Sequence, residues 1–173
     1  MSDRFTALSL GLLFARLVFG LAMAGHGAQK LFGWFGGYGI AGTGGFFENL
    51  GFRPGRLFAL LAGLSEFGGG MLVALGLLGP VGPALIISVM LVAAVTVHIK
   101  NPFFASTNGI EMPLLYAAAA VALALSGPGI YSLDTVLGLE FLWTTPVASI
   151  ALGVGALGGV ANLVLLRKKP VTA

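Results

Sequence analysis

The chain has 173 residues, of which 57% are hydrophobic and 9% are charged, and its formal net charge is +3. A soluble domain carries about 25% charged residues, so this composition excludes a water-exposed globule and indicates an integral membrane protein in a lipid bilayer. The basic residues lie at the ends of apolar segments rather than in one patch, so no nucleic acid is expected as a partner. The chain has no cysteine, which excludes dithiol chemistry, iron–sulfur ligation and disulfides within it.

The first apolar segment, about residues 6–29, carries three ionisable side chains on one face. At helical spacing, Arg16, His26 and Lys30 share a stripe with Phe19 and Met23. Ionisable groups are costly inside lipid, so this stripe is expected to face other protein or trapped water. The later segments should therefore supply its partners.

A glycine- and aromatic-rich connection, residues 31–55, follows the first segment. Its formal GxGxxG pattern at residues 37–42 follows no predicted strand, so we do not interpret it as a dinucleotide site. Thr43 is predicted to cap a short interfacial helix over residues 44–50. The aromatic residues, Trp34 among them, predict either an interfacial belt or a platform for a flat apolar ring or lipid tail.

Two spans are expected over residues 56–78 and 81–99. The first carries Glu66 near its centre, on a face shared with small residues that allow a neighbouring helix to approach closely. The second ends at His98, and a polar loop that contains Glu111 comes next.

The rest of the chain predicts two more spans and one surface helix. The fourth span follows Pro113 and is short for a bilayer. Residues 132–141 are predicted to form an amphipathic surface helix with Ser132 as its N-cap. The last span, residues 146–166, contains Gly155-xxx-Gly159, a motif that favours helix association within the chain or in a homodimer.

The predicted fold is an all-α polytopic membrane bundle with a four-helix core plus an additional C-terminal transmembrane helix. Residues 1–145 form the four-helix membrane domain, and residues 146–173 supply the extra helix and a basic tail. With five spans, one side of the membrane holds seven basic residues and the other only Arg4, so the N-terminus is expected outside and the C-terminus in the cytoplasm. The seven are Lys30, Arg53, Arg56, Lys100, Arg167, Lys168 and Lys169.

The polar residues of the spans predict one shared interior site. Arg16 and Glu66 lie at similar depths in two antiparallel spans, so we expect them to form an ion pair near the midplane. A polar funnel should lead to this pair from the cytoplasmic boundary. Its expected members at that boundary are His26, His98 and Glu111, and Gln29, Lys30 and Lys100 lie on the same membrane side.

Three interpretations of this funnel remain open. The pair could serve only to hold the bundle together. The site could bind a quinone, because His26, His98 and Glu111 could supply hydrogen bonds and a proton route to its carbonyl groups. Two histidines could also ligate haem, which is the least favoured interpretation because a histidine at a membrane boundary is unremarkable. No metal site is expected.

Several segments together resemble the DoxX family of small bacterial membrane proteins. The similarity covers about residues 8–138, whereas residues 146–173 add a segment beyond the family's usual four helices. The segments that carry the resemblance are His26-Gly27-Ala28-Gln29-Lys30-Leu31-Phe32-Gly33, Gly42-Thr43 with Phe46-Phe47, Glu66-Phe67-Gly68-Gly69-Gly70, Thr96-Val97-His98, and Glu111 before Pro113.

The resemblance implies a role in membrane redox chemistry at the bacterial inner membrane. The family's name comes from a subunit linked to quinone-dependent thiosulfate oxidation, and relatives are associated with complexes that handle oxidative stress. We therefore expect a membrane subunit of a quinone-linked oxidoreductase complex with soluble redox partner proteins. A non-catalytic scaffold or small-solute conduit is the alternative. The expected catalytic residues are Glu66, His26, His98 and Glu111, and the expected ligand-binding residues are Arg16, Lys30, Gln29 and Trp34.

Overall fold

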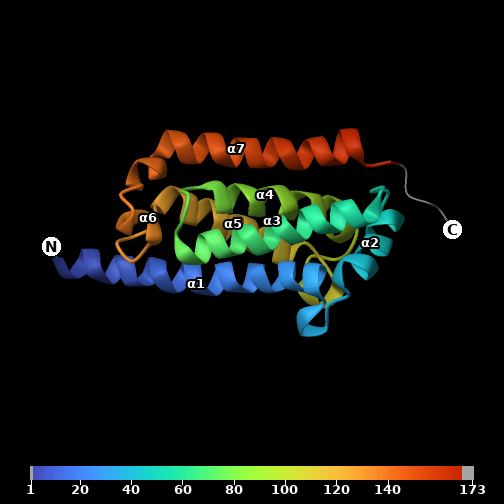
Figure 1. Ribbon diagram of the computed structural model, residues 1–173, viewed down its shortest axis with the longest axis horizontal. Coiled ribbons are helices and arrows are strands. Elements are labelled where there is room, and N and C mark those ends of the chain that lie inside the picture. The colour runs from blue at the N-terminus through green and yellow to red at the C-terminus, as the bar shows by residue number, and fades with distance from the viewer. Residues whose placement is uncertain (1, 169–173) are drawn as a thin grey trace.

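The computed structural model describes residues 2–168 as a bundle of helices joined by short turns. The long helices run side by side along the long axis, with α2 at one end of the bundle and α6 at the other (Figure 1). The helices are α1 (Ser2–Phe32), α2 (Gly39–Asn49), α3 (Gly55–Leu75), α4 (Val81–Ala93), α5 (Glu111–Ser126), α6 (Leu133–Val136) and α7 (Thr145–Ala161). Helices α4 and α7 each continue into a π-helical segment, Ala94–His98 and Asn162–Leu166.

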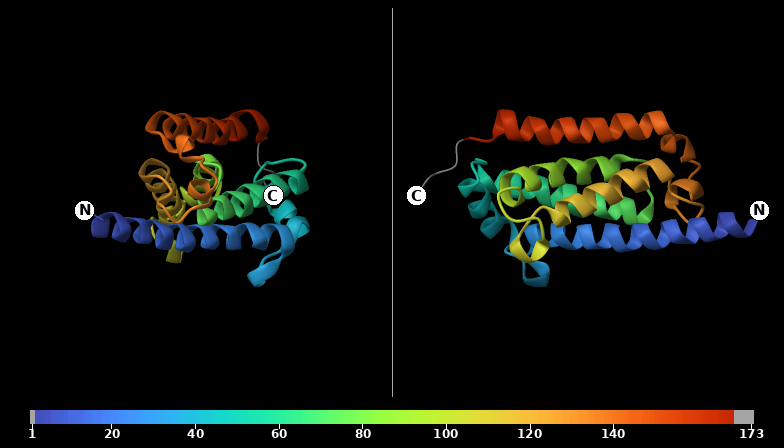
Figure 2. Two further views of the ribbon diagram at one scale, coloured as in Figure 1. Left: turned by 60° about the vertical axis from the view of Figure 1, so that its left-hand side comes forward. Right: turned by 180° about the vertical axis from the view of Figure 1, so that it is seen from behind.

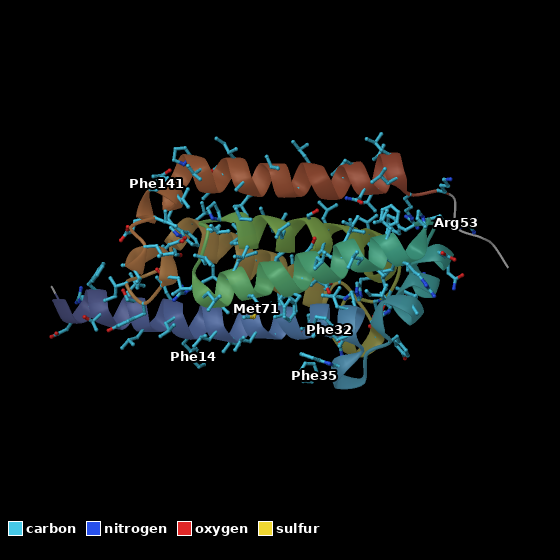
Figure 3. The ribbon with its side chains drawn as sticks, in the orientation of Figure 1. Phe14, Phe32, Phe35, Arg53, Met71 and Phe141 are labelled. Atoms are coloured by element: carbon cyan, nitrogen blue, oxygen red, sulfur yellow. The ribbon has the colours of Figure 1, made fainter. Side chains whose placement is uncertain are left out.

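The long helices identify a multi-pass membrane protein in contact with a lipid bilayer. Helices α1, α3, α4 with its π-helical extension, and α7 with its own are each long and apolar enough to cross a membrane. Helix α5 is shorter, at 16 residues, and runs beside α4 (Figure 2). Large apolar side chains such as Phe14 and Phe35 point outward from the bundle (Figure 3). The predicted all-α bundle, with a four-helix core and an additional C-terminal helix, is confirmed.

Glycines set the spacing and the register between α1 and α3. A Cβ added to Gly20 would lie 2.6 Å from the Gly70 carbonyl oxygen, and one added to Gly70 would lie 2.5 Å from the Ala24 nitrogen. A Cβ added to Gly27 would lie 2.7 Å from the Gly63 carbonyl oxygen. Such distances leave no room for a side chain, so the two backbones touch. Only one antiparallel register brings all these glycines into contact.

We expect Gly27→Ala to destabilise the bundle, because the new methyl group meets the α3 backbone. Overpacking of this kind costs about 1–3 kcal/mol, which outweighs the helix-propensity gain of about 1 kcal/mol. Gly25→Ala is the matched control, since a Cβ there meets nothing within 4 Å. Thermal unfolding in detergent measures both variants, and equal melting temperatures would contradict the close packing.

Helix α7 packs on the outer side of α4 through the Gly155-xxx-Gly159 motif (Figure 1). A Cβ on Gly155 would meet the Ala84 backbone, and one on Gly159 would lie 2.9 Å from the Ser88 carbonyl oxygen. Both glycines are buried. The motif therefore serves helix association within the chain rather than presenting a free surface to a second copy.

The end of α7 is tied to the connection between α2 and α3. The Lys168 backbone nitrogen donates to the Gly51 carbonyl oxygen at 2.9 Å, and Arg167 Nε donates to the Leu50 carbonyl oxygen at 2.8 Å. Phe52 and Arg167 form an antiparallel bridge. The described chain thus ends beside α2, on the end of the bundle opposite the start of α1.

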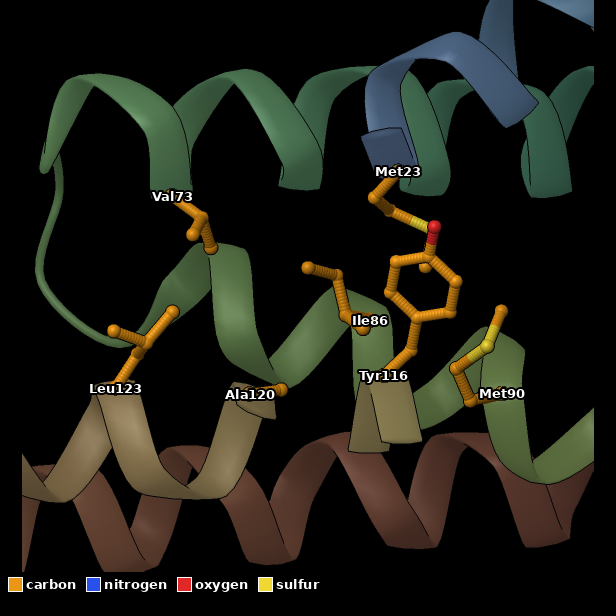
Figure 4. Packing of buried hydrophobic residues seen from close by; sticks show 7 residues of the cluster. All are labelled: Met23, Val73, Ile86, Met90, Tyr116, Ala120 and Leu123. Carbon is orange, nitrogen blue, oxygen red and sulfur yellow. The ribbon is translucent and has the colours of Figure 1, made fainter. Parts of the chain in front are cut away.

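The apolar core lies between α1, α3, α4 and α5. Tyr116 extends from α5 toward Met23 of α1, with Met90 and Ile86 of α4 beside it (Figure 4). The ring of Tyr116 also makes edge contacts with Phe19, at 6.3 Å between ring centroids. This core places a tyrosine hydroxyl in the middle of the bundle.

Two local predictions differ from the structure. Helix α2 begins at Gly39, so Thr43 is a buried helical residue and not an N-cap. Residues 132–141 do not form one amphipathic helix: Ser132 caps α6 as predicted, at 3.2 Å from the Thr135 nitrogen, but α6 ends at Val136. The predicted surface helix is wrong because Asp134 is fully buried and fixes the chain against the bundle. Lys169 of the basic tail lies outside the described residues.

Candidate functional site

A cleft of about 710 Å³ lies at the α2 end of the bundle, between α2, α3, α4 and the end of α7. Its walls are mostly apolar and include Phe47, Phe58 and Val92. The polar side chains among its lining residues are Gln29, Lys30, Tyr38, Ser65, Glu66, Ser88, Thr96, His98, Asn108 and Asn162. Four of the eight predicted site residues, namely Gln29, Lys30, Glu66 and His98, therefore line one cleft.

A buried ion pair joins α1 to α3 at the cleft. Lys30 Nζ lies 2.6 Å from Glu66 Oε2, and the Glu66 side chain is only 4% exposed. Charged groups this deep in an apolar surrounding need a partner, and the pair provides it. Lys30 remains partly exposed and has further N–H donors for a ligand.

The expected ion pair between Arg16 and Glu66 is wrong. Arg16 lies near the middle of α1, about four helical turns before Lys30, and its Nη2 donates to the Tyr131 carbonyl oxygen. The glycine contacts set α1 and α3 in a register that places Glu66 level with residues 26–27, and Arg16 level with Gly76. Arg16 and Lys30 are 14 residues apart, about 21 Å along the helix. The predicted single funnel is therefore two separate polar clusters.

The second cluster is built around Asp134, which is fully buried. Its carboxylate accepts hydrogen bonds from the backbone nitrogens of Leu78 at 2.9 Å and Gly79 at 2.7 Å, and from Trp143 Nε1 at 2.7 Å. Arg16, which is 1% exposed, lies close enough to interact with it electrostatically. Asp134 thus fastens the segment after α5 to the turn between α3 and α4, and it balances the charge of Arg16.

Hydrogen bonds orient two of the cleft residues. His98 Nδ1 lies 2.9 Å from the Asn108 carbonyl oxygen, and because a carbonyl oxygen only accepts, Nδ1 must carry the proton. This leaves Nε2 of neutral His98 as an acceptor. Gln29 Nε2 donates to the Phe35 carbonyl oxygen at 3.2 Å, which ties the end of α1 to the turn that follows it.

Three other predicted residues lie outside the cleft lining. His26 is exposed on the α5 side of α1, with its ring 5.8 Å from that of Tyr116. The Glu111 carboxylate accepts from the Ala105 nitrogen at 2.7 Å and so holds the loop before α5. Trp34 is exposed and packs on Phe32, with ring centroids 4.8 Å apart.

The structure also reveals site residues that the residue types alone did not indicate. Asn162 lines the cleft from the π-helical extension of α7, and the buried Tyr116, which is outside the cleft lining, lies near both His26 and Glu66. Within residues 2–168, both π-helical segments border the cleft, one through Thr96 and His98 and the other through Asn162. Such segments occur frequently at functional sites. The two π-helical segments depend on how the helix backbones pack, so the pattern of residues in the sequence did not predict them.

The fold and the cleft define a multi-pass helical membrane protein with a mostly apolar cleft between its helices, into which a few polar side chains point. A sequence model of the DoxX family matches residues 11–99, about half of the chain, and the protein belongs to this family. No curated protein and no solved structure matches the chain. The matched segment runs from α1 to the π-helical end of α4, and so contains Lys30, Glu66 and His98 but neither Glu111 nor α7.

Proposed function

We propose that the protein is the membrane subunit of a quinone-linked oxidoreductase complex that serves sulfur or oxidative-stress redox chemistry. The observation that carries this proposal is the cleft, in which aromatic and aliphatic walls surround polar groups gathered at Lys30 and Glu66. Ligand sites of this kind bind a mostly apolar molecule and orient it with a few polar contacts. A quinone has this distribution of apolar and polar groups.

The cleft residues have chemistry that suits a quinone head. Lys30 can donate a hydrogen bond to a carbonyl oxygen of the quinone while it keeps its contact with Glu66. His98 and Glu66 can exchange the protons that accompany reduction to the quinol. Phe47 and Phe58 offer apolar contact area to the ring. In this proposal Arg16 and Asp134 hold the far end of the bundle.

The electrons come from a partner protein in this proposal. Reduction of a quinone to a quinol takes up two electrons and two protons, and this chain has no cysteine to supply them. A soluble redox protein would dock at the α2 end, where Arg53, Arg56, Lys100 and Lys168 are exposed. By the positive-inside rule this end faces the cytoplasm of a bacterial inner membrane. A periplasmic signal from a reporter fused after residue 173 would reverse that orientation.

Quinone that remains bound through purification in mild detergent provides the test, with extraction and mass spectrometry as the readout. Wild-type protein should retain quinone, and Glu66→Gln should retain at least ten-fold less. Val92→Phe, which adds volume to the α4 wall of the cleft and keeps both residues of the ion pair, should have the same effect. Lys100→Met, at an exposed residue outside the cleft lining, should leave the amount of retained quinone unchanged.

Equal quinone content in all four proteins would overturn the proposal. Solute flux into liposomes that is blocked by Val92→Phe, with no quinone bound, would instead support the alternative of a small-solute conduit. Melting temperatures close to that of the wild type would show that the variants are folded.

A further inference from the structure

A second depression, of about 410 Å³, lies between α4 and α7 and is almost wholly apolar. It is lined by Val81, Ala84, Leu85 and Ser88 of α4, and by Ala151, Val154, Gly155 and Gly158 of α7. Ser88 also lines the cleft that contains Lys30 and Glu66. On α7, Gly158 is one helical turn from Asn162, which lines the same cleft. The two depressions are therefore consecutive parts of one groove, the α4–α7 groove.

The groove has a polar end and an apolar end. Its lining on α4 extends from Val81 to His98, which corresponds to about 25 Å along the helix. The charged side chains, Lys30 and Glu66, line only the end near α2. At the other end small residues such as Ala151 and Gly158 leave space between the two helices. Because α4 and α7 cross the membrane, the groove runs across the bilayer.

We propose that the α4–α7 groove holds the hydrocarbon tail of the molecule whose polar head occupies the cleft. The ligand class is then a long-tailed amphiphile, and not a small water-soluble solute. The identity of the head depends on the proposed quinone function, whereas the place of the tail depends only on the groove. A lipid tail by itself would leave the polar end without a partner, and a tail-less solute would leave the apolar end unfilled.

Binding of the tail gains little free energy from the hydrophobic effect, since the tail comes from a bilayer that is as apolar as the groove. Its affinity must come from close packing against the two helices, as helix association does in membranes. A side chain that fills the groove should therefore remove the tail's contribution. It should leave the contacts of the head at Lys30 and Glu66 unchanged.

Gly158→Leu is the variant that tests this inference. A Cβ there would lie 3.6 Å from Ser88 Oγ, an ordinary contact, and because Gly158 lines the groove we expect the rest of the leucine side chain to extend into it. Gly153→Leu is the matched control, because a Cβ at Gly153 meets nothing within 4 Å on the exposed side of α7. Binding of hexadecyl-benzoquinone and of methyl-benzoquinone is measured for both variants in nanodiscs.

We expect Gly158→Leu to weaken hexadecyl-benzoquinone binding at least ten-fold, with methyl-benzoquinone binding unchanged and Gly153→Leu like the wild type. If Gly158→Leu changes neither affinity while both quinones bind, the groove proposal fails and the quinone function stands. Equal effects of Gly158→Leu and Gly153→Leu would also overturn the groove.

A probe without a quinone head separates the two proposals. Hexadecanol with a diazirine at the end of its tail should label residues 81–85 and 151–155, and Gly158→Leu should reduce this labelling. If this occurs while neither benzoquinone binds, the tail site stands and the quinone assignment fails. Labelling that is spread evenly over the outer faces of α3 and α7 would indicate ordinary boundary lipid and would overturn the groove.

Discussion

Replacing Asp134 with alanine should lower the free energy of unfolding by about 3–5 kcal/mol, the cost of breaking a buried charged network by removing one partner. The variant leaves the backbone nitrogens of Leu78 and Gly79 and the indole of Trp143 without their acceptor. It also leaves Arg16 buried without the nearby negative charge. Thermal unfolding in detergent measures the loss.

Two further variants locate the source of this effect. Glu140→Ala removes an exposed carboxylate from the same segment and should leave the melting temperature unchanged. Arg16→Met should cost less than Asp134→Ala, because Asp134 keeps its three hydrogen-bond donors when the guanidinium is absent. Equal melting temperatures for Asp134→Ala and Glu140→Ala would show that Asp134 does not hold the bundle together.

Lys30→Met should destabilise the protein by about 3 kcal/mol, the cost of a lone charge at the centre of a membrane helix. The substitution leaves the buried Glu66 carboxylate without the ammonium group 2.6 Å away. The double variant Lys30→Met/Glu66→Met should recover most of this loss, since no buried charge then remains at the site. A double-mutant cycle of melting curves measures the coupling.

A second double-mutant cycle, of Arg16→Met with Glu66→Met, is the control for the coupling between Lys30 and Glu66. The two residues belong to separate clusters, so their effects should add to within about 0.5 kcal/mol. Strong coupling between Arg16 and Glu66, or none between Lys30 and Glu66, would contradict the ion pairing in the structure.

The helices could be predicted from the sequence, but most of their contacts could not. Long apolar segments bounded by glycine, proline and basic residues locate the spans to within a few residues, because the bilayer fixes their length. The partner of Glu66 depends on the register between α1 and α3. Counting residues from the ends of the spans placed Arg16 beside Glu66, whereas the contacts of Gly20, Gly27 and Gly70 bring the last turns of α1 to Glu66, where Lys30 pairs with it.

The contacts of Asp134 likewise could not be predicted from the sequence. Polar and apolar residues near it that would fall on opposite faces of a helix are typical of a helix on the membrane surface. The pattern cannot show that the turn at residues 76–79 presents backbone N–H groups to this carboxylate. The burial cost of charge correctly indicated that Arg16 and Glu66 face the protein interior, without indicating which groups neutralise them.

The hydrogen bonds between residues 167–168 and residues 50–52 limit how far the chain can be shortened without loss of the cleft. Asn162 forms part of the cleft wall, and it lies far beyond residue 99, where the family match ends. A shortened protein that keeps only the matched segment would lose that wall and the fastening beside it. Expression of the matched segment alone is therefore a poor substitute for the 173-residue chain in any assay of ligand binding.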